Sequence, residues 1–147
     1  MNREFSRLIV GLLKSNSVKK WFRAYFNFGL MNYINGGKRL LRCEMGSKAC
    51  FIDPSGDVLP CNGMNSKMPM GNIREQTFDE IWKGSQADDV RKAVDTCNKE
   101  CWMVGNVVPV MKKYIHIPVK WILKNKLRVT MGNNLCWQML KQVQHDK

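Results

Sequence analysis

Four cysteines in two widely separated groups constrain the fold of this chain more than any other feature. Cys43 and Cys61 are separated by seventeen residues, and the local pair Cys97 and Cys101 follows after a further thirty-five. Thiolate ligands of one metal site must converge within a few ångströms, so the fold would have to bring the local pair together with two distant partners. Four convergent sulfurs suit a tetrahedral zinc ion or an iron–sulfur cluster. These gaps differ from the tight C-x2-C pairs of a common zinc ribbon, which disfavours zinc without excluding it.

The number of cysteines and the length of the apolar runs indicate a cytoplasmic protein. Six cysteines in 147 residues are too few for a secreted scaffold built on disulfides. The apolar run at 8–13 is too short for a signal peptide, and charged residues interrupt the longest apolar stretch, 102–123, so we expect no membrane span. In a reducing compartment, clustered cysteines bind metal or perform redox chemistry more often than they form disulfides.

The basic charge of the chain, formally +12, lies in its two flanks. Residues 1–42 carry nine lysines and arginines against one acid, residues 43–101 carry seven against ten, and residues 102–147 carry eight against one. Such asymmetry indicates segments with different roles. Basic charge points to nucleic acid, an anionic membrane surface or an acidic partner, but it does not choose among them.

The N-terminal flank has the spacing of two helices. We expect a helix over 5–14, a break at 15–17 and then an aromatic-rich helix. The aromatic residues of the second helix are Trp21, Phe22, Tyr25, Phe26 and Phe28. Because cations lie among these rings, the helix could form a surface for single-stranded nucleic acid. Core packing is the favoured interpretation, since aromatic residues at helical spacing usually face the interior.

The segment after Cys43 has the pattern of a β-hairpin. Residues 49–52 and 57–61 are strand-like, and the Asp-Pro-Ser-Gly sequence at 53–56 is typical of a type I turn. The hairpin would deliver Cys61 at its exit, and a loop over 62–72 would follow.

Two short helices are predicted after that loop. Thr77 and Glu80 form a capping box, in which each side chain accepts a hydrogen bond from the other's backbone N–H group. Ser85 could cap the second helix, which would return the chain to Cys97. Its expected buried positions are Val90, Ala93 and Val94.

The C-terminal flank contains a basic, apolar segment at 111–129. Pro118 would begin or kink a helix that carries Trp121, Ile122 and Leu123 among several lysines. Such a helix could lie on an anionic membrane surface or dock on a partner. Packing back onto another part of the protein is favoured, because amphipathic helices are common in folded domains.

The residues around the cysteines combine into one longer pattern. Cys43, twelve residues, Gly56, four residues and Cys61 form C-x12-G-x4-C, and Cys97-x3-Cys101 follows. The hairpin sequence, Gly-Asn-Ile at 71–73 and Phe-Asp-Glu-Ile-Trp at 78–82 lie within the same region. Together, these features over residues 43–102 resemble the SPASM and twitch domains, which hold auxiliary [4Fe-4S] clusters in radical S-adenosylmethionine (SAM) enzymes.

Departures from that family limit what the resemblance implies. A full SPASM domain has seven cysteines and usually two clusters, whereas this chain offers only Cys97 and Cys101 at the closing motif, so we expect one cluster, as in a twitch domain. The C-x3-C-x2-C loop of the SAM-cleaving cluster does not occur in the sequence, and no series of βα repeats precedes Cys43. We therefore expect that this chain alone does not cleave SAM.

The resemblance implies a site, a cofactor and a partner. Cys43, Cys61, Cys97 and Cys101 would hold one [4Fe-4S] cluster for electron transfer or substrate positioning. SAM would bind only to a partner or to a domain outside this sequence. The expected partner is a radical SAM barrel, in cis or in trans, with a peptide or a small molecule as substrate. Residues 1–42 would resemble the last part of that barrel, and nucleic acid is not an expected ligand.

The two other cysteines have no assigned role in the site. Cys50 lies within the first predicted strand and off the family spacing, so it is interpreted as a packed thiol; its replacing Cys43 as a ligand is the alternative. Cys136 lies in a polar tail and is treated as incidental.

The sequence thus predicts an α+β fold in which a small domain of one β-hairpin and short helices binds the cluster between basic helical segments. The expected segments are a basic N-terminal segment at 1–42, a cluster domain at 43–102, a basic amphipathic segment at 103–129 and a polar tail at 130–147. Two other classes stay open: a structural four-cysteine zinc module, and a basic polyanion-binding protein whose cysteines are merely packed thiols.

Overall fold

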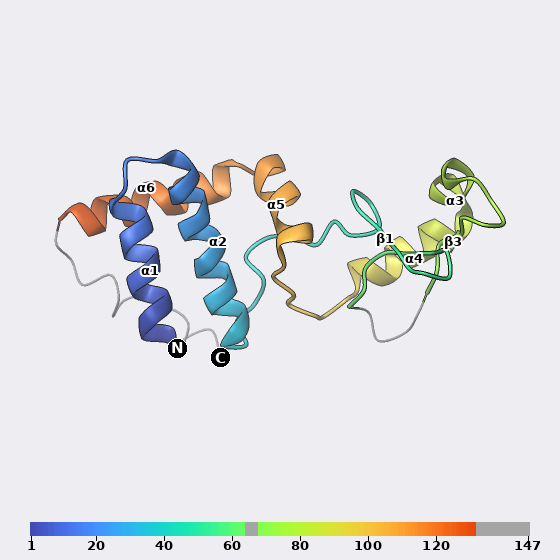
Figure 1. Cartoon of the computed structure of the whole chain (residues 1–147), viewed down its shortest axis with the longest axis horizontal. Helices are drawn as coiled ribbons and strands as arrows, with labels where there is room; N and C mark the ends of the chain where they lie inside the picture. The colour runs from blue at the N-terminus through green and yellow to red at the C-terminus, as the bar shows by residue number, and fades with distance from the viewer. Residues whose placement is uncertain (64–67, 132–147) are drawn as a thin grey trace. The chain divides into compact units, whose positions relative to one another are not determined.

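The chain folds into two compact units. The structure, a computed structural model, describes residues 1–63 and 68–131, and Figure 1 labels its helices and strands. One unit, Cys43–Lys99, is here called the cysteine unit. The other, the helical unit, combines Met1–Arg42 with the described residues from Glu100 onward. The two basic flanks therefore fold together, although the cysteine unit separates them in the sequence. Of the predicted polar tail at 130–147, the residues from 132 onward lie outside the described residues.

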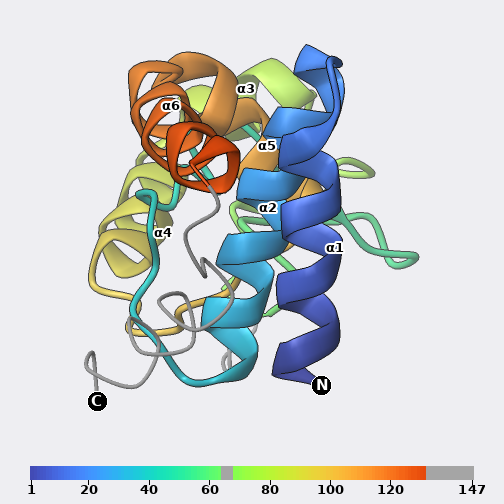
Figure 2. The same cartoon turned by 90° about the vertical axis from the view of Figure 1, so that its left-hand side faces the viewer.

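Four helices build the described part of the helical unit: α1 (Asn2–Lys14), α2 (Val18–Ile34), α5 (Val104–Lys113) and α6 (His116–Thr130). Helix α1 begins three residues earlier than the predicted start, and the predicted break follows it at Ser15, whose hydroxyl donates to the Leu12 carbonyl at 2.8 Å. Figure 2 shows α1 and α2 side by side, and α6 packs against both.

The core of the helical unit forms where α1, α2 and α6 meet. Ile9 and Leu13 are fully buried, because their spacing of four places them on one side of α1. They pack with buried Ala24, Phe28 and Met31 of α2. Burial of such aliphatic and aromatic side chains is the main stabilising term for a small helical unit.

The aromatic residues of α2 contribute to this core. Tyr25 and Phe28 are buried, and the ring of Tyr25 lies edge-on to two tryptophans, Trp102 at 6.1 Å and Trp121 at 5.5 Å between ring centres. The three other rings, Trp21, Phe22 and Phe26, are half-buried against the same cluster. The favoured interpretation of these residues as core contacts is confirmed.

Helices α5 and α6 occupy the predicted basic segment. Pro118 lies in the first turn of α6, where the missing N–H would have had no helical partner. Trp121 and Ile122 pack into the core, whereas Leu123 is exposed. No described helix is both long enough and apolar enough to cross a bilayer.

A three-stranded antiparallel sheet organises the cysteine unit. Its strands are β1 (Phe51–Ile52), β2 (Asp57–Leu59) and β3 (Gly71–Asn72), with β2 in the centre. In the hairpin, Phe51 pairs with Leu59 and Ile52 with Val58. The predicted hairpin is therefore confirmed, with shorter strands than the sequence indicated.

The turn of the hairpin has the expected chemistry. The N–H group of Gly56 donates to the Asp53 carbonyl at 3.0 Å, and Gly56 has a φ of +91°, a conformation that favours glycine. The Asp53 carboxylate also accepts from the N–H groups of Ser55 and Asp57. This turn fixes the register of β2 and thereby the place at which the chain leaves toward Cys61.

The expectation of an uninterrupted loop over 62–72 is wrong at its end. Gly71 and Asn72 form β3, which pairs with β2, and the Asn72 side-chain amide donates to the Asp57 carboxylate at 2.9 Å. A two-residue strand has no period of its own. Its strand conformation comes from pairing with β2, which is a contact between distant parts of the sequence.

Two helices follow, α3 (Phe78–Lys83) and α4 (Ser85–Asp95). The predicted capping box is confirmed: the Thr77 hydroxyl accepts from the Glu80 N–H, and the Glu80 carboxylate accepts from the Thr77 N–H at 2.9 Å. The bond from the Thr77 hydroxyl, followed by the one from its backbone, lowers the pKa of Glu80.

The start of α4 differs from the prediction. Gly84 occupies the N-cap, Ser85 is already helical, and no side chain caps this end. The prediction of Ser85 as the cap was wrong because the α3–α4 connection is only one residue long. Of the expected buried positions, Val90 and Val94 are buried and Ala93 is half-buried. The core of the unit consists of Val58, Met70, Ile81, Ala87 and Val90.

Candidate metal centre

The four predicted ligands all lie in loops between secondary-structure elements. Cys43 begins the cysteine unit, and Cys61 follows β2 after the buried residue Pro60. Cys97 follows the C-terminus of α4, where its N–H donates to the Val94 carbonyl at 3.1 Å. Cys101 lies in the helical unit, just before buried Trp102. Loop positions of this kind leave the side chains free to serve as ligands.

By donor chemistry, these side chains fit an iron–sulfur cluster. All four are free thiols; Cys43, Cys61 and Cys101 are half-buried and Cys97 is exposed. Thiolates are the usual ligands of [4Fe-4S] clusters. Within residues 1–63 and 68–131, however, no three or more His, Cys, Asp or Glu side chains lie together as a metal-binding group. In the described part of the cysteine unit, Cys43, Cys61 and Cys97 do not form such a group, and the four-cysteine ligand set stays a prediction.

The loop after Cys43 packs against the residue before Cys61. Gly46 has a φ of +78°, and a Cβ added there would lie 3.2 Å from the Cβ of Pro60. A larger residue would therefore be strained by its backbone and crowded by the proline. This close approach holds two cysteine-bearing segments next to each other within the unit.

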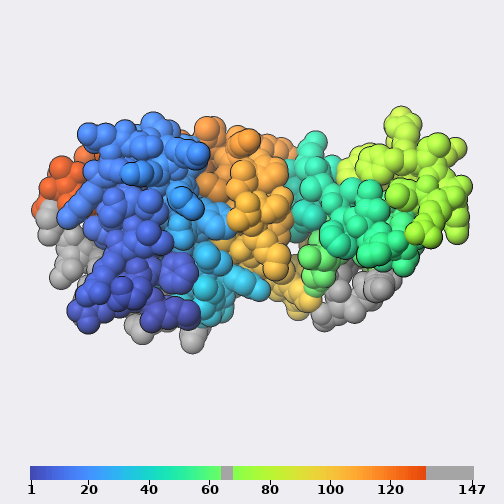
Figure 3. Space-filling view, viewed as in Figure 1, coloured from blue at the N-terminus to red at the C-terminus, as the bar shows by residue number. Residues whose placement is uncertain are grey.

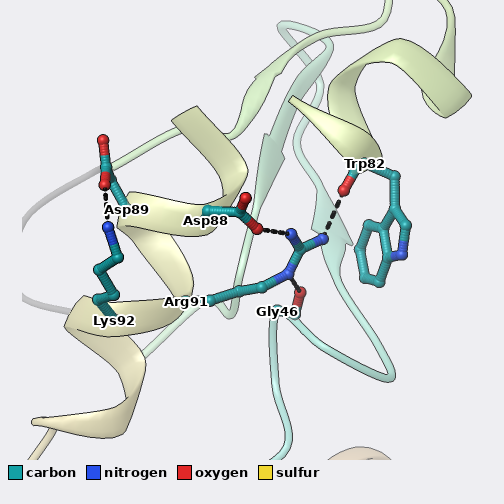
Figure 4. Close-up of polar contacts among 6 residues, drawn as sticks. All are labelled: Gly46, Trp82, Asp88, Asp89, Arg91 and Lys92. Carbon is teal, nitrogen blue, oxygen red and sulfur yellow. Dashed lines mark hydrogen bonds and ion pairs between the residues drawn. The ribbon is translucent and has the colours of Figure 1, made fainter. Parts of the chain in front are cut away.

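Arg91 of α4 fixes the same loop from the other side. Its Nε donates to the Gly46 carbonyl at 2.9 Å and its Nη2 to the Trp82 carbonyl at 2.6 Å (Figure 4). Its Nη1 pairs with Asp88 at 2.6 Å, and the guanidinium lies 4.9 Å from the centre of the Trp82 ring. One side chain thus joins the loop after Cys43 to both helices of the unit.

A second cation joins the loop after Cys61 to the loop after Cys97 within the cysteine unit. The ammonium group of Lys99, between Cys97 and Cys101, donates to the Gly63 carbonyl, two residues after Cys61. The contact joins the loop that leaves the hairpin to the loop that follows α4. It is a direct connection between the segments that carry the early and late predicted ligands.

Arg39 and Trp102 hold Cys101 in the helical unit. The Arg39 guanidinium donates twice to the Cys101 carbonyl, at 3.1 and 2.5 Å, and its backbone N–H donates to the Glu100 carboxylate at 2.6 Å. The indole N–H of Trp102 donates to the Phe26 carbonyl at 2.8 Å. These bonds leave the backbone around the last predicted ligand little freedom.

Three cationic side chains therefore contact the loops that carry the predicted ligands. Arg39, Arg91 and Lys99 each donate to a carbonyl that belongs to a predicted ligand or lies within three residues of one. Positive charge there would offset the negative charge of nearby thiolates. Sequence reasoning did not identify these residues. Only Lys99 carried a signal, its place inside the Cys97-x3-Cys101 pair, whereas the contacts of Arg91 and Arg39 span dozens of residues.

The remaining cysteines differ from the four. Cys50 is half-buried against the core of the cysteine unit, and burial raises the pKa of its thiol. The interpretation of Cys50 as a packed thiol, with its replacing Cys43 as the alternative, stays a prediction. Cys136 lies outside the described residues.

The comparison with protein families identifies this region. Residues 43–103 match the family model of SPASM, the iron-sulfur cluster-binding domain. This part of the chain is thus similar to SPASM domains, and its mixed architecture of short helices and a small antiparallel sheet is compatible with that type. The match includes all four predicted ligand cysteines. Neither the curated proteins nor the solved structures gave a match to the chain.

Proposed function

We propose that the SPASM-type domain binds one [4Fe-4S] cluster through Cys43, Cys61, Cys97 and Cys101. The observation that carries the proposal is the family match, because its span begins at the first of these cysteines and ends two residues after the last. The free state of all four thiols supports it. A cluster held by four thiolates has no open coordination site and exchanges single electrons when bound.

The residues of the chain would act by holding the ligand loops and by balancing charge. Arg91 ties the loop after Cys43 to α4, and Lys99 ties the loop after Cys61 to the segment that follows Cys97. Both cations would offset thiolate charge. Holding the loops in this way reduces the conformational entropy that must be lost when distant ligands bind one group.

The proposed setting is a radical SAM enzyme in the cytoplasm. The SAM-binding barrel would be supplied in cis or in trans, and the auxiliary cluster would transfer electrons or position a peptide or small-molecule substrate. The sequence supports this division of labour, because no C-x3-C-x2-C motif occurs in the chain. SAM itself would bind to the barrel.

Anaerobic purification followed by iron, sulfide and zinc analysis tests the proposal. We expect a brown protein with roughly four irons and four sulfides per chain and a broad visible absorption band. A colourless protein with one zinc and no sulfide would identify a zinc module instead. A metal-free protein that binds polyanions with a steep salt dependence would identify the third class.

Cysteine variants test the ligand set. Cys61→Ala should lose the visible band and much of the folded cysteine unit, because cluster binding and folding are coupled in so small a domain. Cys50→Ala and Cys136→Ala are the matched controls and should retain the band. An undiminished band in Cys61→Ala would show that the ligands are assigned wrongly.

A further inference from the structure

The outward face of α6 exposes a row of apolar side chains. Leu123, Leu127 and Met131 are 59%, 60% and 73% exposed. Their spacing of four residues places them along one side of the helix. Lys120 and Lys124 are exposed on the same side. The five residues are here called the α6 stripe, and they form an amphipathic surface of cations and aliphatic side chains.

The stripe is distinct from the face by which α6 packs. Ile122 and Asn125 are buried, and Trp121 and Val129 lie against the core of the helical unit. In the space-filling view, the C-terminal part of α6, coloured red-orange, reaches the surface of this unit beside α1 (Figure 3). The opposite face of α6 therefore packs against the core of the helical unit, and the stripe stays exposed to solvent.

Lys126 is a cation of α6 that contacts the rest of the helical unit. Its ammonium group donates to the Leu13 and Ser15 carbonyls at 3.2 and 3.0 Å and lies 3.9 Å from the centre of the Trp21 ring. It thus points toward α1 and α2. Lys120 and Lys124 are exposed on the other side, where their charge is available to a ligand.

The surrounding charge is almost entirely positive. The described part of the helical unit has fifteen lysines and arginines and two acids, Glu4 and Glu100. Glu4 pairs with Arg7 at 2.9 Å, and Glu100 accepts the Arg39 N–H at 2.6 Å. Helices α5 and α6 contain no acid at all. The stripe is therefore complementary to a negatively charged surface that can also take up aliphatic side chains.

We infer that the α6 stripe binds the surface of an anionic lipid bilayer. Lysines would contact lipid phosphates while Leu123, Leu127 and Met131 enter the boundary between headgroups and acyl chains, with the helix lying in the membrane plane. This role does not depend on the cluster and concerns the helical unit alone.

Two properties of the stripe favour lipid over a macromolecule. Its centre is aliphatic, whereas single-stranded nucleic acid is bound by aromatic stacking, and Trp121 of the same helix packs against the core of the unit. Its three apolar residues span about 12 Å along a single helix. A row of three side chains covers only a small part of the roughly 800 Å² that each partner buries in a standard protein interface. A bilayer needs no matching pocket, so a short stripe suffices.

Co-sedimentation of the full chain with lipid vesicles tests the inference. We expect binding to phosphatidylcholine vesicles that contain about 30% phosphatidylglycerol, weak binding to phosphatidylcholine alone, and loss of binding in high salt. Leu123→Ser/Leu127→Ser and Lys120→Gln/Lys124→Gln should each lower the partition coefficient about tenfold or more. All four positions are exposed, so circular dichroism should show unchanged helix content.

Val104→Ser is the matched control, since Val104 is an exposed apolar residue (63%) of the same unit on α5, and it should bind as the native chain does. Equal binding to neutral and anionic vesicles, or native binding by both double variants, would overturn the inference. Two other outcomes would also overturn it. The chain could fail to bind vesicles and instead bind poly-uridylate, or it could fail to bind vesicles and instead form a dimer that Leu123→Ser/Leu127→Ser converts to a monomer. Because cluster-free protein should bind equally well, failure here is distinguishable from failure of the proposed cluster.

Discussion

Arg91 connects several segments of the cysteine unit. Its three nitrogens point to three different segments, the loop after Cys43, the end of α3 and its own helix (Figure 4). Arginine suits this position because its planar fork of donors can serve several acceptors at once, which the single ammonium group of lysine cannot do. Its neighbour Lys92 makes one exposed ion pair with Asp89 at 2.8 Å.

Arg91→Ala should lower the free energy of unfolding of the cysteine unit by about 2–4 kcal/mol, because two charge-assisted hydrogen bonds to backbone carbonyls are lost. Urea denaturation measures the change. Lys92→Ala is the control and should leave the midpoint unchanged, since both members of its pair are exposed. Equal effects of the two variants would contradict the assigned role of Arg91.

Tyr25 combines favourable ring packing with an unsatisfied polar group. It is 2% exposed, and among the described residues its hydroxyl is a buried polar atom without a hydrogen-bond partner. Burial raises the pKa of Tyr25 to about 12 from its ordinary 10.0. Since the unfolded chain releases this proton more readily, the stability contributed by neutral Tyr25 is complete below pH 10 and is lost as the pH rises toward 12.

Tyr25→Phe should therefore be neutral or stabilising by about 1 kcal/mol at pH 7, because it removes a buried hydroxyl that has no partner. The variant should also lose less stability than the native chain between pH 10 and 12. Thermal unfolding of both proteins over this range measures the difference. A loss of several kcal/mol at neutral pH would mean that the hydroxyl has a partner after all.

At the scale of elements, the contact between α2 and the segment after Cys101 depends on a helical glycine. A Cβ added to Gly29 would lie 2.1 Å from two atoms of the Trp102 ring. The glycine thus leaves room for the indole, whose N–H reaches the Phe26 carbonyl. Glycine lowers the helix propensity of α2 at this position, but its lack of a side chain allows the Trp102 indole to pack there.

Gly29→Ala should displace Trp102 and destabilise the helical unit by about 1–3 kcal/mol, the usual range for overpacking. Tryptophan fluorescence should shift to the red as the indole becomes hydrated. Gly11→Ala is the matched control: Gly11 is in α1 with no atom within 4 Å of an added Cβ. It should stabilise the unit by about 0.5–1 kcal/mol through helix propensity. Stabilisation by both substitutions would contradict the packing described for Trp102.

Elements held by local contacts could be predicted from the sequence. The type I turn at 53–56 and the capping box of α3 are made by residues two to four positions apart, so the sequence contains both partners. By contrast, β3 and the tethers of Arg91 and Arg39 depend on residues far away in the chain. The four predicted ligands came from spacing, whereas the cations beside their loops carried no comparable pattern.

At the scale of the whole molecule, the two units differ in what stabilises them. Among the residues that the structure describes, the helical unit has two clusters of buried side chains, including several aromatic rings. The described part of the cysteine unit has one smaller core, made from short strands and two short helices. So small a core contributes limited hydrophobic stabilisation, and a bound cluster would supply the remainder.

Removal of the proposed cluster should therefore destabilise the cysteine unit and leave α1 and α2 of the helical unit folded. Hydrogen exchange measured by mass spectrometry should become faster over β1, β2 and α4 after chelation under oxidising conditions, while α1 and α2 keep their protection. The cluster-loaded chain is the reference. Equal loss of protection in α1 and α2 would show that the helical unit also depends on the cluster.

The type I turn, the capping box and the amphipathic helices could be predicted, because each depends on residues that lie close together in the chain. Contacts between distant segments join the two basic flanks into one helical unit, make Gly71–Asn72 a strand, and place Trp121 against the core while Leu123 stays exposed. Burial and strand pairing depend on such distant contacts, which the local sequence does not contain. Helical periodicity shows that a helix has faces, but its neighbours decide which face is covered.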